Sequence, residues 1–324
     1  MEREFEKYIK DSKHILIISH VNPDGDTLGS LCGLYSAILK RYKKKAEMLV
    51  PSHIPDIYNF LPHIKEAKYI LEFDKSREYD LVITVDVAAL DRILDAQVLF
   101  SKAKHTINID HHKTNVGFGQ INIIEPQASS AGEVIFKLLE RCNWEIDKDV
   151  ADSLYTAILT DTGGFRFENT TPESMEIASK LLKIGVNPNE IYKKCYESKS
   201  REVVMFQNYC VGKAIFTSDN EIAYTVIYKK DLEKYNVKDS ATDGIAEVLR
   251  SIVTTKVSFV VKEIDHKLCK ISMRSKSVDV AKVCEVFNGG GHRFAAGCTM
   301  KMSCEDAVKN LLTEIKKGNL WRNL

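Results

Sequence analysis

The chain has 324 residues, 44% of them hydrophobic and 28% charged, a balance that is ordinary for a soluble globular protein. The 46 Lys and Arg residues nearly cancel the 45 Asp and Glu residues, and the net charge of +1 argues against a protein that binds long nucleic acid through many phosphates. No apolar run is long enough to cross a bilayer, and the length suits two domains.

The amino-terminal residues MEREFEK mix both charges and are not followed by an apolar core. We therefore expect no signal or transit peptide, and a cytoplasmic protein. The cysteines form no CxxC pair and lie mostly in apolar segments, as reduced and buried thiols do, so we assign them no chemistry. They stand at positions 32, 142, 195, 210, 269, 284, 298 and 304.

The first half of the chain alternates strand-like and helix-like patterns. An apolar run over residues 14–19 precedes an amphipathic helix whose apolar stripe runs from Leu28 to Tyr42. Further apolar runs cover residues 80–85 and 105–109. Strands that are apolar almost throughout and alternate with helices predict a parallel sheet covered on both faces. In such sheets, functional side chains gather at the carboxyl ends of the strands.

Helical patterns over residues 148–160 and 172–184 follow, and the stretch 186–200, rich in Asn, Pro, Lys, Glu and Ser, predicts a linker. Beyond it, helical patterns cover 202–214, 240–253 and 304–316, and strand patterns cover 222–228, 257–262 and 270–273. We therefore expect an α/β protein with a parallel-sheet domain over residues 1–185 and a smaller α/β domain with a mixed sheet over residues 201–324.

Charged residues follow the first apolar run directly. The sequence HVNPDGD places His20, Asp24 and Asp26 after it, and the intervening proline and glycine require a tight loop in which both carboxylates can face one cleft. A purely structural alternative is open for this loop, with Asp24 as a turn residue and Asp26 as the cap of a helix that begins at Thr27.

Further acidic groups and histidines end later elements. Asp86 follows the run at 81–85, Asp110-His111-His112 follows the next run, and Asp161 ends a helix, where the helix dipole disfavours a negative charge. Carboxylates and imidazoles that converge are the ligands of divalent metals, and this mixed set suits manganese, with magnesium, cobalt or zinc as alternatives. The candidates exceed one coordination shell, which favours two ions that share a carboxylate, about 3.5–4 Å apart.

Four of these sequences together resemble the motifs of the DHH phosphoesterase superfamily. They are HVNPDGD, the VDVA around Asp86, DHH at 110–112 and DTGGF at 161–165. The resemblance implies His20 and Asp24 as ligands of a first metal ion, Asp26, His111 and Asp161 as ligands of a second, and Asp86 as a bridge between them. It also implies that Asp110 braces the site and that His112 contacts the scissile phosphate or the leaving group.

A second motif lies near the end of the chain. The sequence FNGGGH contains Gly289, Gly290, Gly291 and His292. Bare glycine N–H groups can approach an anion, and the amino end of a helix beginning here would favour it further, but a flexible turn before a helix is equally compatible. GGGH followed by AAGC resembles the DHH-associated carboxyl-terminal domain. That resemblance implies that Arg274 and Ser275 help to hold the substrate's terminal phosphate or base.

Nearly the whole chain resembles the two-domain nanoRNase/pAp phosphatase branch of the superfamily. This resemblance implies a two-metal phosphoesterase that hydrolyses nanoRNA, pApA and 3'-phosphoadenosine 5'-phosphate to mononucleotides. The expected partner is a short RNA or a nucleotide, without long duplex nucleic acid or membrane, and a homodimer is compatible with this interpretation. Three alternatives stay open: a cyclic di-AMP phosphodiesterase, an inorganic pyrophosphatase and a non-catalytic nucleotide-binding regulator.

Overall fold

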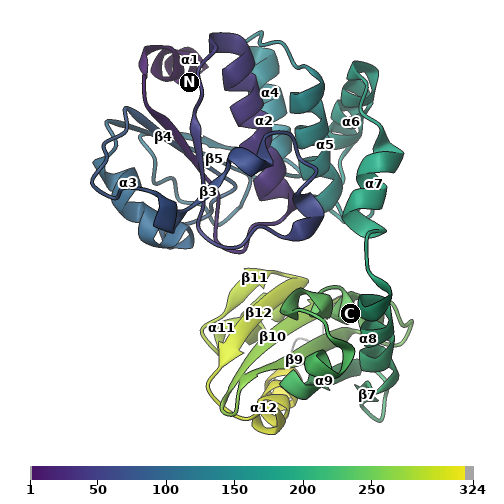
Figure 1. The fold of residues 1–324 in the computed structure, drawn as a ribbon. Coiled ribbons are helices and arrows are strands. Elements are labelled where there is room, and N and C mark those ends of the chain that lie inside the picture. Colours follow the sequence, from purple (N-terminus) through teal and green to yellow (C-terminus); the bar gives the residue numbers. More distant parts are fainter. Residues whose placement is uncertain (1, 318–324) are drawn as a thin grey trace. The chain divides into compact units, whose positions relative to one another are not determined.

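The computed structural model describes residues 2–317 (Figure 1). They form two units, residues 2–198 and residues 199–317. The outer ends of the two expected domains, residue 1 and residues 318–324, lie outside the described residues.

The first unit contains a six-stranded sheet. Its strands are β1 (Ile15–Ile18), β2 (Glu47–Val50), β3 (Lys68–Tyr69), β4 (Leu81–Val85), β5 (His105–Asp110) and β6 (Ile121–Ile124). They lie in the order β3-β2-β1-β4-β5-β6, and every pairing is parallel, which confirms the predicted parallel sheet. The strand order reverses between β1 and β4. In an open parallel sheet, such a switch point opens a crevice outside the carboxyl ends of the strands.

Helices cover both faces of this sheet (Figure 1). They are α1 (Glu2–Asp11), α2 (Gly25–Tyr42), α3 (Gln97–Lys102), α4 (Ala131–Arg141), α5 (Lys148–Asp161), α6 (Pro172–Ile184) and α7 (Pro188–Tyr196), with 3-10 turns η1 (Asp56–Tyr58), η2 (Ile64–Glu66), η3 (Ile70–Glu72) and η4 (Leu90–Ala96). Alternate side chains of β1 show the two faces, because Ile17 packs with α1, α2, α4 and α5 whereas Leu16 packs with η4 and α3.

The stretch 186–200, predicted as a linker, instead contains helix α7. The Asn187 side chain accepts a hydrogen bond from the N–H of Glu190 at 3.3 Å, and Pro188 occupies the first helical position. Ile191 is buried in the core of the first unit, so this helix belongs to that unit. The connection to the second unit is therefore much shorter than predicted.

The second unit contains a mixed sheet, as predicted. Its strands are β7 (Ile215–Phe216), β8 (Ile222–Ile227), β9 (Val257–Asp265), β10 (Leu268–Ser275), β11 (Gly290–His292) and β12 (Ala295–Met300), in the order β11-β12-β10-β9-β8-β7. Only β8 and β9 pair in parallel among these described strands.

One face of the second sheet packs on two helices and the other face on three. The helices are α8 (Arg201–Gly212), α9 (Lys229–Tyr235), α10 (Ile245–Arg250), α11 (Val280–Glu285) and α12 (Cys304–Lys317), with the 3-10 turn η5 (Asp239–Thr242). α11 and α12 share one core, and α8, α9 and α10 share the other. The single helix predicted over residues 240–253 is wrong, because Gly244 adopts a left-handed conformation (φ 86°) that separates η5 from α10.

The glycine run does not begin a helix. Gly290 and Gly291 belong to β11, which pairs with β12 as an antiparallel hairpin. A Cβ atom on Gly289 would lie 2.3 Å from the carbonyl oxygen of Gly297, so close strand packing requires glycine there. The expectation of a helix amino end at this motif is therefore corrected to an edge hairpin.

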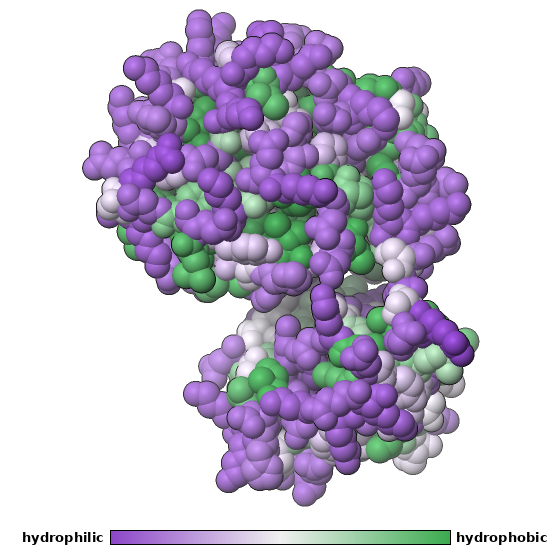
Figure 2. Space-filling model, viewed as in Figure 1, coloured by the Kyte–Doolittle hydropathy of each residue, from purple (hydrophilic) through white to green (hydrophobic). Residues whose placement is uncertain are grey.

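The described residues contain no helix with the length and apolar character that a membrane span needs. On the face drawn in Figure 2, hydrophilic residues cover most of the surface and hydrophobic residues appear in small, separate groups. Scattered hydrophobic residues of this kind are normal for a protein surface. All eight cysteines are free thiols, and only Cys195 is not fully buried.

Candidate metal centre

The candidate ligands lie at the carboxyl edge of the first sheet, beside the point where the strand order reverses. His20 lies just beyond β1, Asp86 directly follows β4, and Asp110 is the last residue of β5. These strands are neighbours, so their ends bring together side chains that are far apart in the sequence. Asp161 reaches the same site from the carboxyl end of α5.

The loop after β1 combines a helix cap with two candidate ligands. Asp24 is the N-cap of α2 and accepts a hydrogen bond from the N–H of Thr27 at 3.0 Å. The helix begins at Gly25, so Asp26 lies in its first turn and does not cap it. The structural alternative for this loop therefore assigned the cap to the wrong aspartate, and capping does not prevent Asp24 from facing the cluster.

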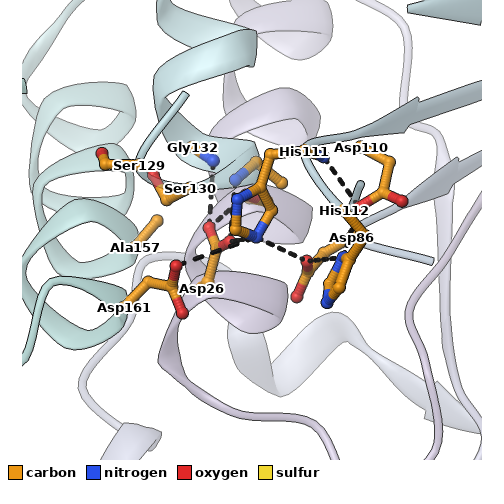
Figure 3. Close-up of polar contacts among 12 residues, drawn as sticks. Asp26, Asp86, Asp110, His111, His112, Ser129, Ser130, Gly132, Ala157 and Asp161 are labelled. Atoms are coloured by element: carbon orange, nitrogen blue, oxygen red, sulfur yellow. Dashed lines mark hydrogen bonds and ion pairs between the residues drawn. The ribbon is translucent and has the colours of Figure 1, made fainter. Parts of the chain in front are cut away.

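The potential ligand atoms form three sets, and within each set all atoms lie within 4.8 Å of one another. Figure 3 shows Asp26, Asp86, His111, His112 and Asp161 from these sets. The sets are His20, Asp24 and Asp86; Asp26, His111 and Asp161; and Asp86, His111 and His112. Asp86 belongs to the first and third sets, so one carboxylate adjoins both sides of the cluster. The structure thus brings together all six predicted ligands, and it adds His112 to their neighbourhood.

Asp86 has a buried carboxylate oxygen that faces two imidazoles, a geometry that suits a metal ligand. Its backbone takes a left-handed conformation (φ 59°), which aspartate tolerates better than most residues. The Oδ1 atom is buried without a hydrogen-bond partner among the described residues, and His112 Nδ1 and His111 Nε2 lie 3.6 and 3.7 Å from it. Burial acts to raise the pKa of Asp86, but hydrogen bonding and charge from His20 outweigh it and hold that pKa below its usual range.

Asp26, which is buried, and Asp161, which is half-buried, carry the opposite shift. Burial, reinforced by the charges of Asp86 and Asp161, holds the pKa of Asp26 well above its ordinary value. Burial also raises the pKa of Asp161 to about 7, against the influence of His111 and with help from Asp24. Carboxylates packed this closely need a compensating cation to be ionised at neutral pH. The donor set and its electrostatics therefore fit divalent metal ions.

His112 is held in place by Asp110. Asp110 is fully buried, and its Oδ1 atom accepts a hydrogen bond from His112 Nδ1 at 2.8 Å. Burial acts to lower the pKa of His112, but this hydrogen bond and the charge of Asp86 raise it to about 9. The other carboxylate oxygen of Asp110 accepts a hydrogen bond from Asn115 Nδ2 at 2.6 Å. The ring orientation of His112 is thus fixed through a buried polar chain.

Thr27 and Asn115 are among the residues that touch this cluster and were not predicted from the sequence. The Thr27 hydroxyl group hydrogen-bonds Asp24 and Asp86 and contacts the Nε2 atom of His20. Asn115 holds Asp110 and also donates to the carbonyl oxygen of Val87, directly after Asp86. Both residues lie within five positions of a motif, and that proximity was the only signal in the sequence.

In the second unit, the predicted substrate-binding residues lie on β10 and at β11, two strands that β12 separates. Arg274 pairs with Ala295 across β10 and β12, and His292 pairs with Ala295 across β12 and β11. Residues opposite each other on adjacent strands point to the same face, so Arg274 and His292 share one face of the sheet. Two strand spacings separate their backbones by about 10 Å. Arg274 is further held by an ion pair between its Nε atom and Glu247 Oε1 at 2.6 Å. In β11, a Cβ atom built on Gly290 would meet no atom within 4 Å, so the space there is open.

Ser275, predicted to contact the substrate, has a structural role that was not predicted. Its side chain is buried, accepts hydrogen bonds from the N–H groups of Ser277 and Val278, and donates to the carbonyl oxygen of Lys256. The hydroxyl group therefore holds the turn after β10. Its predicted contact with substrate stays a prediction.

Replacing Ser275 by Ala is expected to lower the free energy of unfolding by about 1–3 kcal/mol, because two backbone N–H groups lose their acceptor. Ser277→Ala is the matched control, since the Ser277 hydroxyl group is buried without a partner among the described residues and its removal should be close to neutral. Urea unfolding of both variants tests this, and equal stability of the two would contradict the structural role.

Comparison with known proteins matches both units. The model of the DHH family, N-terminal domain, matches residues 14–158, and the DHHA1 domain matches residues 219–318. The protein of Thermus thermophilus named bifunctional oligoribonuclease and PAP phosphatase NrnA is 30% identical over 305 residues, which are 94% of this chain and 89% of that protein. The protein of the same name from Bacillus subtilis is 28% identical over 303 residues, 93% of each chain.

A solved structure resembles the whole chain. It is an exopolyphosphatase-related protein from Bacteroides fragilis, with a TM-score of 0.92 and 30% sequence identity. The match covers 98% of this chain and 95% of that one. The fold and the order of its elements are therefore shared with a protein of nearly the same length.

Proposed function

Because this chain belongs to the DHH family of phosphoesterases, we propose that it is a two-metal hydrolase of short oligoribonucleotides and of 3'-phosphoadenosine 5'-phosphate. The observation that carries the proposal is the cluster at the switch point, where carboxylates and imidazoles from four segments meet around the buried Asp86. The two relatives named oligoribonuclease and PAP phosphatase, each aligned over more than nine tenths of this chain, support this activity over the three alternatives.

We assign the metal positions by the sets of neighbouring ligand atoms. His20, Asp24 and Asp86 would hold one ion, and Asp26, His111 and Asp161 would hold the other, with Asp86 shared. Mixed carboxylate and imidazole donors favour manganese among the divalent metals. When bound, such ions lower the pKa of water and neutralise charge that develops on phosphate oxygens.

The remaining residues bind and orient the substrate. His112, whose Nδ1 atom is held by Asp110, can donate a hydrogen bond from its other nitrogen to a phosphate oxygen or to the leaving group. A pocket of about 140 Å³, lined by residues that include Asp24, Tyr58, Asp161 and Tyr196, adjoins the cluster and gives the reacting group room. In the second unit, Arg274 and His292 would hold a terminal phosphate on the shared sheet face.

Incubation of the purified protein with manganese and pApA tests the activity, and the expected product is AMP. Release of AMP from 3'-phosphoadenosine 5'-phosphate by the same preparation would support the second activity. Cleavage of pyrophosphate alone would contradict the proposal in favour of a pyrophosphatase, and faster cleavage of cyclic di-AMP than of pApA would favour the cyclic dinucleotide enzyme. Binding of pApA without any AMP would favour the regulator.

His292→Ala is expected to raise the KM for pApA about tenfold or more with little change in kcat, because a charged hydrogen bond to phosphate contributes about 1.5–3 kcal/mol to binding. His266→Ala is the matched control, since His266 is also exposed but lies in the turn between β9 and β10. Steady-state kinetics on both variants check this. An unchanged KM for His292→Ala would remove His292 from the substrate site.

A homodimer and a cytoplasmic location remain predictions of the sequence. Light scattering after size-exclusion chromatography tests the first, because a monomer has a mass of 36.7 kDa and a dimer has twice that mass. Fractionation of the source cells tests the second.

A further inference from the structure

One short segment contacts two members of a single set of candidate ligands and reaches the third through Asn169. The segment is Ala128–Gly132, which precedes α4 and enters its first turn, and the set is Asp26, His111 and Asp161. None of these segment residues was predicted from the sequence to belong to the site. Figure 3 shows part of the segment beside these ligands.

The segment fixes the imidazole of His111. The carbonyl oxygen of Ala128 lies 3.2 Å from His111 Nδ1, and a carbonyl can only accept, so the Nδ1 atom carries the proton. The Nε2 lone pair is then directed at the carboxylates, with Asp26 and Asp161 oxygens 3.6 and 3.7 Å away. A histidine that binds a metal ion through its Nε2 atom requires this tautomer.

The same segment holds the carboxylate of Asp26. The N–H groups of Ala131 and Gly132 donate to its two oxygens at 2.7 and 3.0 Å. These are the first amides of α4, so the helix dipole also favours the negative charge. The segment is itself braced, because the Glu133 carboxylate accepts hydrogen bonds from the N–H and the hydroxyl group of Ser129 at 2.9 and 2.6 Å.

Asn169 connects the segment to the third ligand. Its Nδ2 atom donates to the carbonyl oxygen of Ser129 at 2.9 Å and to Asp161 Oδ2 at 3.1 Å. It also lies 3.2 Å from the carbonyl oxygen of Asp161, at the end of α5. One half-buried amide thus joins the support of Asp26 and His111 to Asp161 itself.

We propose that Ala128–Gly132, joined by Asn169, is a positioning element for one of the two metal ions and leaves the other ion unaffected. The inference rests on the metal centre of the proposed function. The hydrogen bonds of the segment go to Asp26, His111 and, through Asn169, Asp161, whereas His20 and Asp24 are bonded by Val21 and Thr27. Partners that hold ligands in this way typically change metal affinity by about 10–100-fold when they are removed.

The test is calorimetric titration of manganese into the metal-free full chain. Wild type is expected to bind two ions. Asn169→Ala is expected to weaken one of them by about 10–100-fold and to leave the other within about twofold. Asn122→Ala is the matched control. Among the described residues, the half-buried side-chain amide of Asn122, on β6, hydrogen-bonds the backbone of Gly119, away from the candidate ligands, so its removal should change neither affinity.

A background variant assigns the weakened ion. In Asp24→Asn, the set with Asp26, His111 and Asp161 keeps all its ligands. Adding Asn169→Ala to this variant should remove most of its remaining affinity for manganese. In Asp161→Asn, the same addition should have little effect. The midpoint of thermal unfolding without metal must stay close to that of wild type in Asn169→Ala, which separates positioning from a general loss of structure.

A second pair of variants tests the segment without touching Asn169. A Cβ atom on Gly132 would lie 2.4 Å from the Cβ of Ala157 on α5, so Gly132→Ala should push the two amides away from Asp26 and weaken the same ion. Gly132→Ala combined with Ala157→Gly removes the clash and should restore most of the affinity. Figure 3 shows the two positions facing each other.

Several results would overturn the inference. If wild type binds two ions and Asn169→Ala lowers the affinity for both equally, or for neither, selective positioning is contradicted. The proposed function would then stay intact. Gly132→Ala without any loss of affinity would do the same. Wild type that binds no manganese would overturn the metal centre itself, and the proposed function with it.

Discussion

Asp86→Asn is expected to lower kcat/KM for pApA by more than about 10³-fold, the range seen when one member of a catalytic unit is removed. Asp86 is the carboxylate that adjoins ligands on both sides of the cluster, so its loss should affect both metal positions. The amide has nearly the same shape and removes a buried charge, so the protein should remain folded. Steady-state kinetics and circular dichroism measure the two effects.

Asp91→Asn is the matched control for this prediction. Asp91 is exposed in η4, only a few residues beyond Asp86, and lies outside the sets of candidate ligands. It should keep wild-type kinetics. If Asp86→Asn kept more than a tenth of the activity, the shared position of Asp86 between two ions would be wrong.

Removal of divalent metal should destabilise the first unit by several kcal/mol. Burial and neighbouring carboxylates raise the pKa of Asp26 and of Asp161, so ionising these two groups costs folding free energy. A bound cation would offset that cost. An ion present at 100 times its Kd stabilises the folded state by about 2.7 kcal/mol, so two ions contribute about 5 kcal/mol. The midpoint of thermal unfolding should therefore rise when manganese replaces EDTA.

The two units provide an internal control for this experiment. The second unit contains no group of three potential ligands among its described residues, so its unfolding should not shift with manganese. Trp144 lies buried in the first unit, and its fluorescence follows that unit. Identical midpoints of thermal unfolding in EDTA and in manganese would contradict metal binding at this cluster. A manganese-dependent shift of the midpoint as large in Asp86→Asn as in wild type would contradict it as well.

The position of the candidate cluster could be predicted from the sequence because local patterns determine where the charged residues fall. Apolar runs that end in charged residues predict the carboxyl edge of a parallel sheet, and three such runs end at His20, Asp86 and Asp110. What the runs do not specify is strand order. The neighbouring positions of β1, β4 and β5, which bring these ends together, depend on long-range pairing.

Other predictions failed because two conformations suited the same local sequence. The glycines before His292 are compatible with a helix amino end and with an edge strand, and pairing with β12 selects the strand. Gly244 was included in a predicted helix, although its left-handed backbone interrupts the helical conformation just before α10. Helix α7 was missed despite a readable signal, since Asn187 followed by Pro188 and Glu190 is a typical helix start.

The supporting residues were the least predictable part of the site. Asn169 contacts Ser129, 40 positions earlier in the chain, and Ala131 and Gly132 contact Asp26 across more than 100 positions. Such contacts leave no periodic pattern in one sequence. Motifs therefore indicated the candidate ligands, and the structure was needed to find what holds them.

Anomalous diffraction from crystals grown with manganese tests the central claim most directly. The account predicts two anomalous peaks about 3.5–4 Å apart, with the Asp86 carboxylate between them, His20 and Asp24 on one side and Asp26, His111 and Asp161 on the other. Crystals that contain manganese but show no peak within this cluster, or only a single peak that Asp86 does not touch, would contradict it.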